Sequence, residues 1–203
     1  MCASFTRIQL ENWLKTIDVK ADSVIDIGGS QNLITGRVKS WDVKDYKILD
    51  LEKPHEMKRK PDIIGDLNYF EKCHYDKYRD YFDIAFCMEV SEYWFNPMTA
   101  LENISNCLKK GGILYISFSF IYPVHEPVDQ DYLRYTPRGV EKLLEETGFE
   151  ILEMKHRLLK EPSDFMQTQE KLFNVWTEEG MRPAKNYDKH NVVGCLVKAQ
   201  KKG

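Results

Sequence analysis

The sequence predicts an α/β fold: an open, mostly parallel sheet of about seven strands with helices on both faces. Short apolar runs recur along the chain, and segments with helical spacing separate several of them. Acidic residues also stand at the ends of the first three runs. Ligands of such sheets bind outside the carboxyl ends of the strands. The sequence therefore places these acids together at a candidate ligand edge.

Size and composition are those of one domain, residues 1–203, because 203 residues with 42% apolar content suffice for one core. The net charge of -3 comes from interspersed acids and bases, so no nucleic-acid partner is expected. No apolar run approaches the roughly 20 residues that span a bilayer. The five cysteines contain no C-x-x-C pair, which favours a reducing, cytoplasmic compartment without disulfides or a metal site.

The first element is an amphipathic helix over residues about 4–17, within a flanking segment 1–20. Leu10, Trp13 and Leu14 fall at helical spacing, and Ser4 is available as the N-cap. This pattern predicts a helix that packs against the sheet and is not a secretory signal.

The strands are expected where apolar runs are bounded by turn residues. The first run ends in an acid and two glycines, and the next two repeat the form of apolar residues followed by an acid. A strand-like segment and a final run complete the predicted sheet. The predicted strand segments are 23–29, 46–51, 61–67, 82–90, 111–121, 149–154 and 190–199.

Two further helices carry start and stop signals. Asn96-Pro97 is a cap followed by a preset first residue, and the basic segment 109–112 is expected to form the last turn and the stop. Thr136-Pro137 opens the second helix in the same way, and Gly148 ends it. Residues 157–187 form a less regular insertion before the last strand, with one helical segment around residues 169–176.

The turn after the first strand, residues 26–30, contains small residues that let a ligand approach the backbone closely. A tight turn without a ligand would explain this pattern equally well. Asp50 follows the second strand at a distance typical of an acid that binds a ribose diol. Asp66, at the end of the third run, is able to accept a hydrogen bond from an exocyclic amine. Each acid alone fits a helix cap or a solvated loop, but three at successive strand ends favour a binding site.

The ordered segments VIDIGG, ILDL, DIIGDL, FDIAFCMEV-SEYWFNP and LKKGGILYIS resemble the motif set of class I, Rossmann-like S-adenosylmethionine-dependent methyltransferases. The resemblance covers residues 23–154, with matching order and spacing. It implies S-adenosylmethionine as cofactor and S-adenosylhomocysteine as product. The residues that it implies around the cofactor are Asp26, Gly28, Gly29 and Ser30 at the methionine part, Asp50 with Leu51 at the ribose, Asp66 with Leu67 at the adenine, and Met88 with Glu89 closing the pocket.

Two positions depart from the family's pattern. Ser30 and Asn32 stand where further glycines are usual, which makes the loop contacts less definite. Tyr93 stands where the family commonly has a histidine, which removes one candidate base.

The polar and aromatic segment 122–136 follows the fifth strand at the ligand edge and is expected to bind the acceptor. It resembles the His, Pro, Asp-Tyr, Arg-Tyr-Thr loop of a methyltransferase subset, many of which act on sugars or other small metabolites. His125 is the first candidate for a general base and Asp131 the second. A solvated His125 and an Asp131–Arg134 ion pair that pins the loop are the structural alternatives. Arg134 is alternatively expected to bind an anionic acceptor, because a guanidinium matches a phosphate or a carboxylate. The predicted acceptor-binding residues are Glu92, Tyr93, Tyr132, Arg134 and Tyr135.

The expected activity is methyl transfer to an oxygen, or less readily a nitrogen, of a small acceptor. On the loop resemblance this acceptor is a sugar or a phosphate-bearing precursor of a surface polysaccharide. A non-catalytic, methyltransferase-like binding subunit is the alternative, because fold does not establish activity. An NAD-dependent oxidoreductase is disfavoured, since residues 28–33 do not supply G-x-G-x-x-G.

Overall fold

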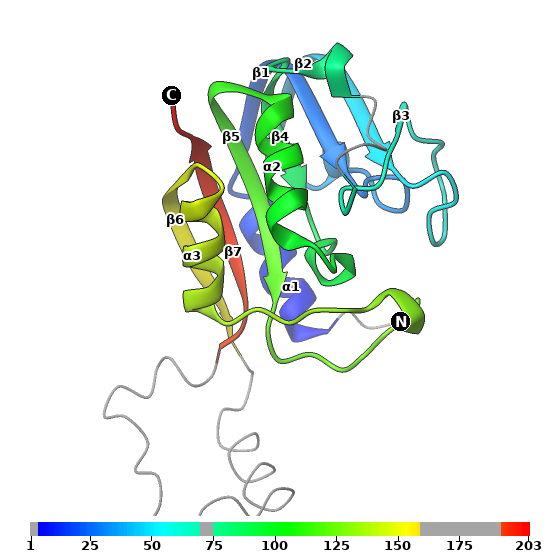
Figure 1. Cartoon of the computed structure of the whole chain (residues 1–203), viewed down its shortest axis with the longest axis vertical. Helices are drawn as coiled ribbons and strands as arrows, with labels where there is room; N and C mark the ends of the chain where they lie inside the picture. Colours follow the sequence, from blue (N-terminus) through cyan, green and yellow to red (C-terminus); the bar gives the residue numbers. More distant parts are fainter. Residues whose placement is uncertain (1–3, 70–74, 159–191) are drawn as a thin grey trace, which may run out of the picture.

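The computed structural model describes residues 4–69, 75–158 and 192–203, which form a seven-stranded sheet with helices on both faces (Figure 1). The strand order is β3-β2-β1-β4-β5-β7-β6. The first five strands in this order are parallel, and β7 is antiparallel to both of its neighbours. The predicted fold class is confirmed. The strands are β1 (Asp18–Ile27), β2 (Ser40–Asp50), β3 (Ile63–Ile64), β4 (Phe82–Cys87), β5 (Leu108–Ser119), β6 (Phe149–Leu158) and β7 (Val192–Lys201).

One face of the sheet is covered by α1 (Phe5–Leu14), which lies behind the sheet in Figure 1. The Ser4 hydroxyl accepts a hydrogen bond from the Arg7 N–H at 3.2 Å, as expected of an N-cap. The helix buries Leu10, Trp13 and Leu14 against this face of the sheet. The predicted N-terminal helix is therefore confirmed, and it forms the smaller of two cores.

The other face is covered by α2 (Pro97–Cys107) and α3 (Pro137–Glu146), in front of the sheet in Figure 1. The Thr136 hydroxyl caps α3 by accepting from the Gly139 N–H at 3.1 Å, and Gly148 follows with a φ of +82°. These helices pack over the larger core, which contains Phe82, Trp94 and Phe118.

The end of α2 differs from the prediction. The segment 109–112 was expected in the last helical turn, but α2 ends at Cys107 and β5 begins at Leu108. Leu108 is fully buried opposite Phe82 in the sheet, and this burial outweighs one more turn of helix. Between the pairs Phe82–Leu108 and Ile84–Ile113 the register shifts, so residues 109–112 form an irregularity within the strand.

Two connections contain 3-10 turns: η1 (Ile34–Gly36) lies between β1 and β2, and η3 (Tyr75–Tyr78) precedes β4. The helical segment expected around residues 169–176 lies outside the described residues. The described helices include none that is long and apolar enough to cross a membrane.

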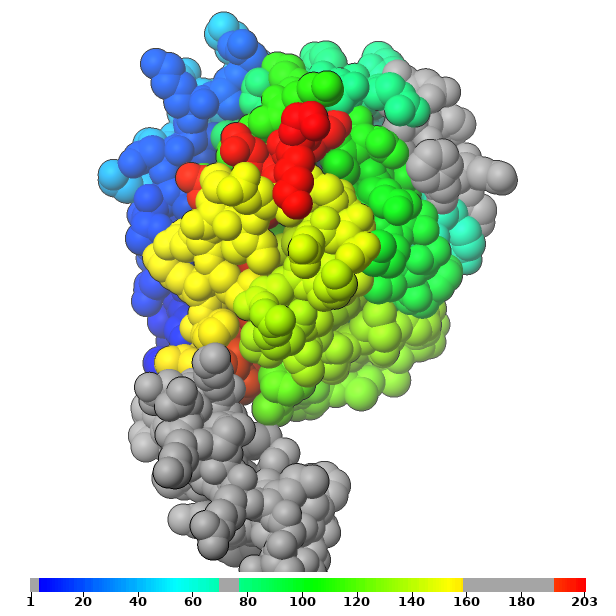
Figure 2. All heavy atoms as spheres, turned by 60° about the vertical axis from the view of Figure 1, so that its left-hand side comes forward, coloured from blue at the N-terminus to red at the C-terminus, as the bar shows by residue number. Residues whose placement is uncertain are grey.

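The outer surface over β6 and α3 is shown in Figure 2, with the last residues of the chain lying across its end. The Lys202 N–H donates to the Gly148 carbonyl at 2.9 Å and ties the chain end to the turn after α3. The carboxyl ends of β1, β2, β3 and β4 meet at one edge of the parallel part of the sheet, because parallel strands end on the same side.

Candidate functional site

The turn after β1 needs a glycine at position 28. Gly28 has a φ of +72°, and its N–H donates to the Leu49 carbonyl at 2.9 Å. A Cβ at this position would lie 2.4 Å from the Val90 Cγ2, closer than any real contact. The turn is thereby held between the ends of β2 and β4.

Asp26 lies beneath this turn and is buried. One carboxylate oxygen accepts from the Ile34 N–H at 2.9 Å and from the Tyr46 hydroxyl at 2.6 Å. Burial raises the pKa of Asp26 to about 6, and the two hydrogen bonds oppose the shift. Asp26 therefore organises the turn from below.

The ends of β2 and β3 present two more carboxylates. Asp50 accepts from the Ser30 N–H at 3.2 Å and from the Leu51 N–H at 2.9 Å. Asp66 accepts from the backbone and side-chain N–H groups of Asn68 at 2.9 and 3.0 Å. Both carboxylates are partly exposed at this edge of the sheet.

A cavity of about 450 Å³ opens at this edge. Its volume falls within the range of about 300–1,000 Å³ that is usual for small-molecule sites. Its lining joins the turn after β1, the ends of β2 and β3, the segment after β4 and the loop after β5. The lining residues are Ile27, Gly28, Gln31, Leu49, Asp50, Leu51, Pro54, His55, Gly65, Asp66, Leu67, Asn68, Tyr69, Glu89, Val90, Tyr93, Trp94, Phe95, Pro127, Asp129, Gln130 and Tyr132.

The chemistry of this lining fits a nucleoside-bearing cation such as S-adenosylmethionine. Asp50 offers a carboxylate for a vicinal diol, and Asp66 offers one for an amine donor. The apolar side chains of Leu67 and Val90 suit a flat ring. The buried Ser30 hydroxyl, beside the Asp50 contact, has no hydrogen-bond partner among the described residues.

Glu89 follows β4 with a φ of +59°, a left-handed conformation that is uncommon for a residue with a side chain. Its N–H donates to the Ser117 hydroxyl at 2.7 Å, and its carboxylate binds the buried Arg157 guanidinium at 2.6 Å. Arg7 on α1 is a second partner at 3.8 Å. Met88, its neighbour, is buried in the core beneath α1.

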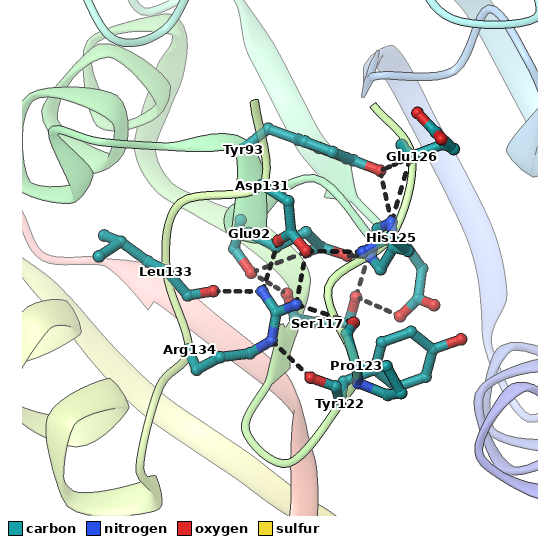
Figure 3. Close-up of polar contacts among 12 residues, drawn as sticks. Glu92, Tyr93, Ser117, Tyr122, Pro123, His125, Glu126, Asp131, Leu133 and Arg134 are labelled. Carbon is teal, nitrogen blue, oxygen red and sulfur yellow. Dashed lines mark hydrogen bonds and ion pairs between the residues drawn. The ribbon is translucent and has the colours of Figure 1, made fainter. Parts of the chain in front are cut away.

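The segment after β5, residues 122–134, folds back over η4 (Ser91–Tyr93) and is held by Arg134 (Figure 3). Two guanidinium N–H groups bind the Asp131 carboxylate at 2.5 and 2.6 Å. The other three donate to the carbonyls of Tyr122, Pro123 and Leu133 at 2.9 to 3.1 Å. Since a guanidinium has five N–H donors, Arg134 has none left for a ligand.

His125 lies in the middle of this loop (Figure 3). Its Nε2 is 3.7 Å from the buried Glu92 carboxylate, and its Nδ1 is 3.2 Å from the Tyr93 hydroxyl and 3.1 Å from the Glu126 carbonyl. The Glu92 carboxylate beside the ring raises the pKa of His125 to about 9. The ring is therefore protonated at neutral pH, with both nitrogens available as donors.

The structure divides the predicted site residues into two groups. Those that line the cavity are Gly28, Asp50, Leu51, Asp66, Leu67, Glu89, Tyr93 and Tyr132. Those that do not line it are Asp26, Gly29, Ser30, Met88, Glu92, His125, Asp131, Arg134 and Tyr135. In the second group, Tyr135 donates its hydroxyl proton to the Ser91 carbonyl at 2.8 Å.

Several lining residues were not singled out from the sequence. Tyr69, Phe95 and Asp129 are exposed and line the cavity, although no motif marks them. The available signal was position alone, because each lies a few residues beyond a strand end or inside the loop after β5. Cys73 and His74, which carried no metal prediction, lie outside the described residues.

Comparison with known proteins agrees with this architecture. Residues 49–116 match the family described as "Methyltransferase domain". Among curated proteins, no sequence is significantly similar to this chain.

Three solved structures illustrate the fold match. A chain of the complex between the Haloferax volcanii Trm112 methyltransferase activator and a putative methyltransferase has a TM-score of 0.60 and 16% identity, covering 98% of this chain and 90% of that one. A putative methyltransferase from Bacillus halodurans has a TM-score of 0.58 and 16% identity, covering 97% and 98%. Haemonchus contortus phosphoethanolamine N-methyltransferase 2, in complex with S-adenosylmethionine, has a TM-score of 0.55 and 14% identity, covering 98% and 52%.

The chain therefore has the Rossmann-like fold of class I methyltransferases, and its segment 49–116 matches the methyltransferase-domain family.

Proposed function

We propose that the chain is an S-adenosylmethionine-dependent methyltransferase that acts on an oxygen, or less readily a nitrogen, of a small acceptor. One observation carries the proposal: Gly28, Asp50 and Asp66, from three successive strand ends, line one cavity of about 450 Å³. The match of residues 49–116 to the methyltransferase-domain family supports the same activity. When bound, S-adenosylmethionine would supply a methyl group activated by a sulfonium sulfur.

The residues around the cavity take distinct parts in binding. Asp50 accepts hydrogen bonds from the ribose hydroxyls, while Asp66 and Leu67 hold the adenine. Gly28 lets the backbone approach the ligand, and Asp26 keeps the turn in place from below. These parts follow from donor chemistry and from the position of each residue at the sheet edge.

Catalysis is proposed to depend mainly on positioning. Neither His125 nor Asp131 lines the cavity, and both Asp131 oxygens are bound to Arg134. His125 contacts the lining through Tyr93, whose hydroxyl lies 3.2 Å from the His125 Nδ1. We therefore assign His125 and Asp131 as positioning residues, and His125 becomes a proton acceptor only as the pH rises through about 9.

Calorimetric titration with S-adenosylmethionine, S-adenosylhomocysteine and NAD tests the cofactor. Both adenosyl compounds should bind and NAD should not. Asp50→Ala should weaken binding by about 1–3 kcal/mol, because hydrogen bonds to a charged group are lost. Asp42→Ala, an exposed aspartate at the start of the same strand, is the matched control and should bind normally.

Two results would count against this function. Unchanged affinity in Asp50→Ala would remove Asp50 from the site. Failure of the unaltered protein to bind either adenosyl compound would favour the alternative of a non-catalytic, methyltransferase-like subunit.

A further inference from the structure

The charged groups on the cavity wall are almost all acidic. Four carboxylates line it, those of Asp50, Asp66, Glu89 and Asp129, and His55 is the only lining side chain among the described residues that can become a cation. The loop cation Arg134 is outside the lining. An anionic acceptor would therefore enter a negative cavity in which no described lining residue offers a guanidinium or an ammonium to bind it.

The four carboxylates are not equivalent. The Arg157 guanidinium forms an ion pair with the Glu89 carboxylate at 2.6 Å and neutralises its charge. Asp50 lies at the strand end beside the glycine turn, on the side assigned to the cofactor. Asp129 belongs to η5 (Val128–Gln130) in the loop after β5, and its exposed carboxylate has no hydrogen bond or ion pair with another described residue. Asp129 thus offers its charge to a ligand on the acceptor side.

Three exposed aromatic residues line the same cavity and form an aromatic rim, defined as Tyr69, Phe95 and Tyr132. Adjacent rings meet edge to face, with centroids 5.5 Å apart for Tyr69–Phe95 and 5.6 Å for Phe95–Tyr132. They are 41, 47 and 48% exposed, although large apolar side chains are usually buried. Aromatic faces attract cations through the ring quadrupole. The aromatic rim and the Asp129 carboxylate therefore both favour a positively charged ligand.

We propose that the methyl acceptor carries a protonated amine, recognised by the Asp129 carboxylate together with the rings of Phe95 and Tyr132. This inference rests on the proposed function and narrows its acceptor to cationic small molecules, such as amino sugars and arylalkyl amines. Acceptors bearing phosphate or carboxylate are disfavoured by the same wall. The sugar-hydroxyl acceptor expected from the loop resemblance is retained only where the sugar also bears an amine.

A pair of probes with one ring and opposite charges tests the proposal. Tyramine and 4-hydroxyphenylacetate share a phenol ring but carry an ammonium and a carboxylate. Each is titrated calorimetrically into the full chain, alone and after saturation with S-adenosylhomocysteine. Tyramine should bind about fivefold more tightly, the effect of one partly exposed charge pair worth about 1 kcal/mol.

Three variants test which residues cause the preference for tyramine over 4-hydroxyphenylacetate. Asp129→Asn should bring the two affinities within about twofold, because the side chain keeps its shape and loses its charge. Glu126→Gln, which removes the same charge from the same loop outside the cavity, should keep the preference. Phe95→Leu should weaken both probes, since it removes one ring of the aromatic rim.

The outcomes separate the two proposals. If S-adenosylhomocysteine binds but the probes bind equally, or neither binds at millimolar concentration, the acceptor inference is wrong and the methyltransferase proposal stands. An undiminished preference in Asp129→Asn, or unchanged tyramine binding in Phe95→Leu, would also overturn it. If S-adenosylhomocysteine fails to bind, the proposed function fails, and the preference for tyramine is still measured on the protein alone.

Discussion

The pair Arg134–Asp131 tests how the loop after β5 is held. The Asp131 side chain has no exposed surface, and Arg134 is 22% exposed. Arg138 and Glu141, on α3, form a second pair with the same separation in sequence, but the Arg138 side chain is 91% exposed. The chain thus contains two ion pairs of equal spacing and opposite burial, which makes one the control of the other.

The perturbation is Arg134→Met, which keeps most of the aliphatic stem and removes all five N–H donors. Asp131 would then be a buried carboxylate with one remaining donor, the His125 N–H at 3.0 Å. Removing one partner of a buried pair costs about 3–5 kcal/mol. Because Arg134 is partly exposed and water can reach an opened loop, we expect about 2–3 kcal/mol.

This cost should appear as local opening of the loop, since its polar contacts lie outside the two hydrophobic cores. Hydrogen exchange followed by NMR measures it at three amides. The His125 N–H donates to Asp131, and the Tyr132 and Leu133 N–H groups donate to the Glu92 carbonyl. Their protection should fall together in Arg134→Met, while amides in β4 keep theirs.

A double-mutant cycle separates the pair from the rest of the loop. Arg134→Met combined with Asp131→Asn should cost less than the sum of the single changes, with a coupling of at least about 1 kcal/mol. The Arg138→Met and Glu141→Gln cycle should show no measurable coupling. Equal couplings in the two cycles would refute the claim that burial of Asp131 makes its ion pair hold the loop.

Three further predictions concern protonation and the turn after β1. Glu92 raises the pKa of His125 from 6.5 to about 9, so the contribution of His125 to loop stability is complete below about pH 6.5 and is lost as the pH rises through 9. An NMR titration midpoint near 6.5 would contradict this. His125→Gln should abolish the pH dependence of loop stability and keep the affinity for S-adenosylhomocysteine. Gly28→Ala should lower the free energy of unfolding by about 2 kcal/mol in denaturant titrations, whereas Gly36→Ala, whose Cβ would meet no atom within 4 Å, should change it little. The pKa of Asp26 is raised from 3.8 to about 6, so the free energy of unfolding should fall by up to about 3 kcal/mol as the pH rises from 3.8 to 6. Asp26→Asn should remove this pH dependence.

Much of the fold could be predicted because local signals and burial agree. Ser4 and Thr136 cap their helices as their residue types indicate, and the apolar runs form the strands. The prediction was wrong at residues 109–112, where the basic and glycine residues are typical of a helix end. There the burial of Leu108 against β4 decided the structure, and such a tertiary contact has no local signature.

The candidate site was predicted best where it is built from strand ends. Asp50 and Asp66 line the cavity because parallel strands finish at one edge, a rule that depends only on strand order. The residues of the loop after β5 were harder to sort, since His125, Asp129 and Asp131 are all polar residues within seven positions. Which of them faces the cavity depends on how the loop folds over η4, and spacing does not determine that.

Charged side chains in the loop after β5 fall into two kinds: those that bind other residues of the protein, and those that remain available to a ligand. A guanidinium near a candidate site favours an anionic acceptor when read from sequence, as Arg134 does here. In the structure its five donors are taken by Asp131 and three carbonyls, so its charge stabilises the loop and is not offered to the cavity. Asp129 lies two residues from Asp131 with no such partner among the described residues, so the acceptor side of the cavity keeps a negative charge. Counting satisfied donors and acceptors therefore favours the cationic acceptor proposed above over the anionic one that the loop composition alone suggests.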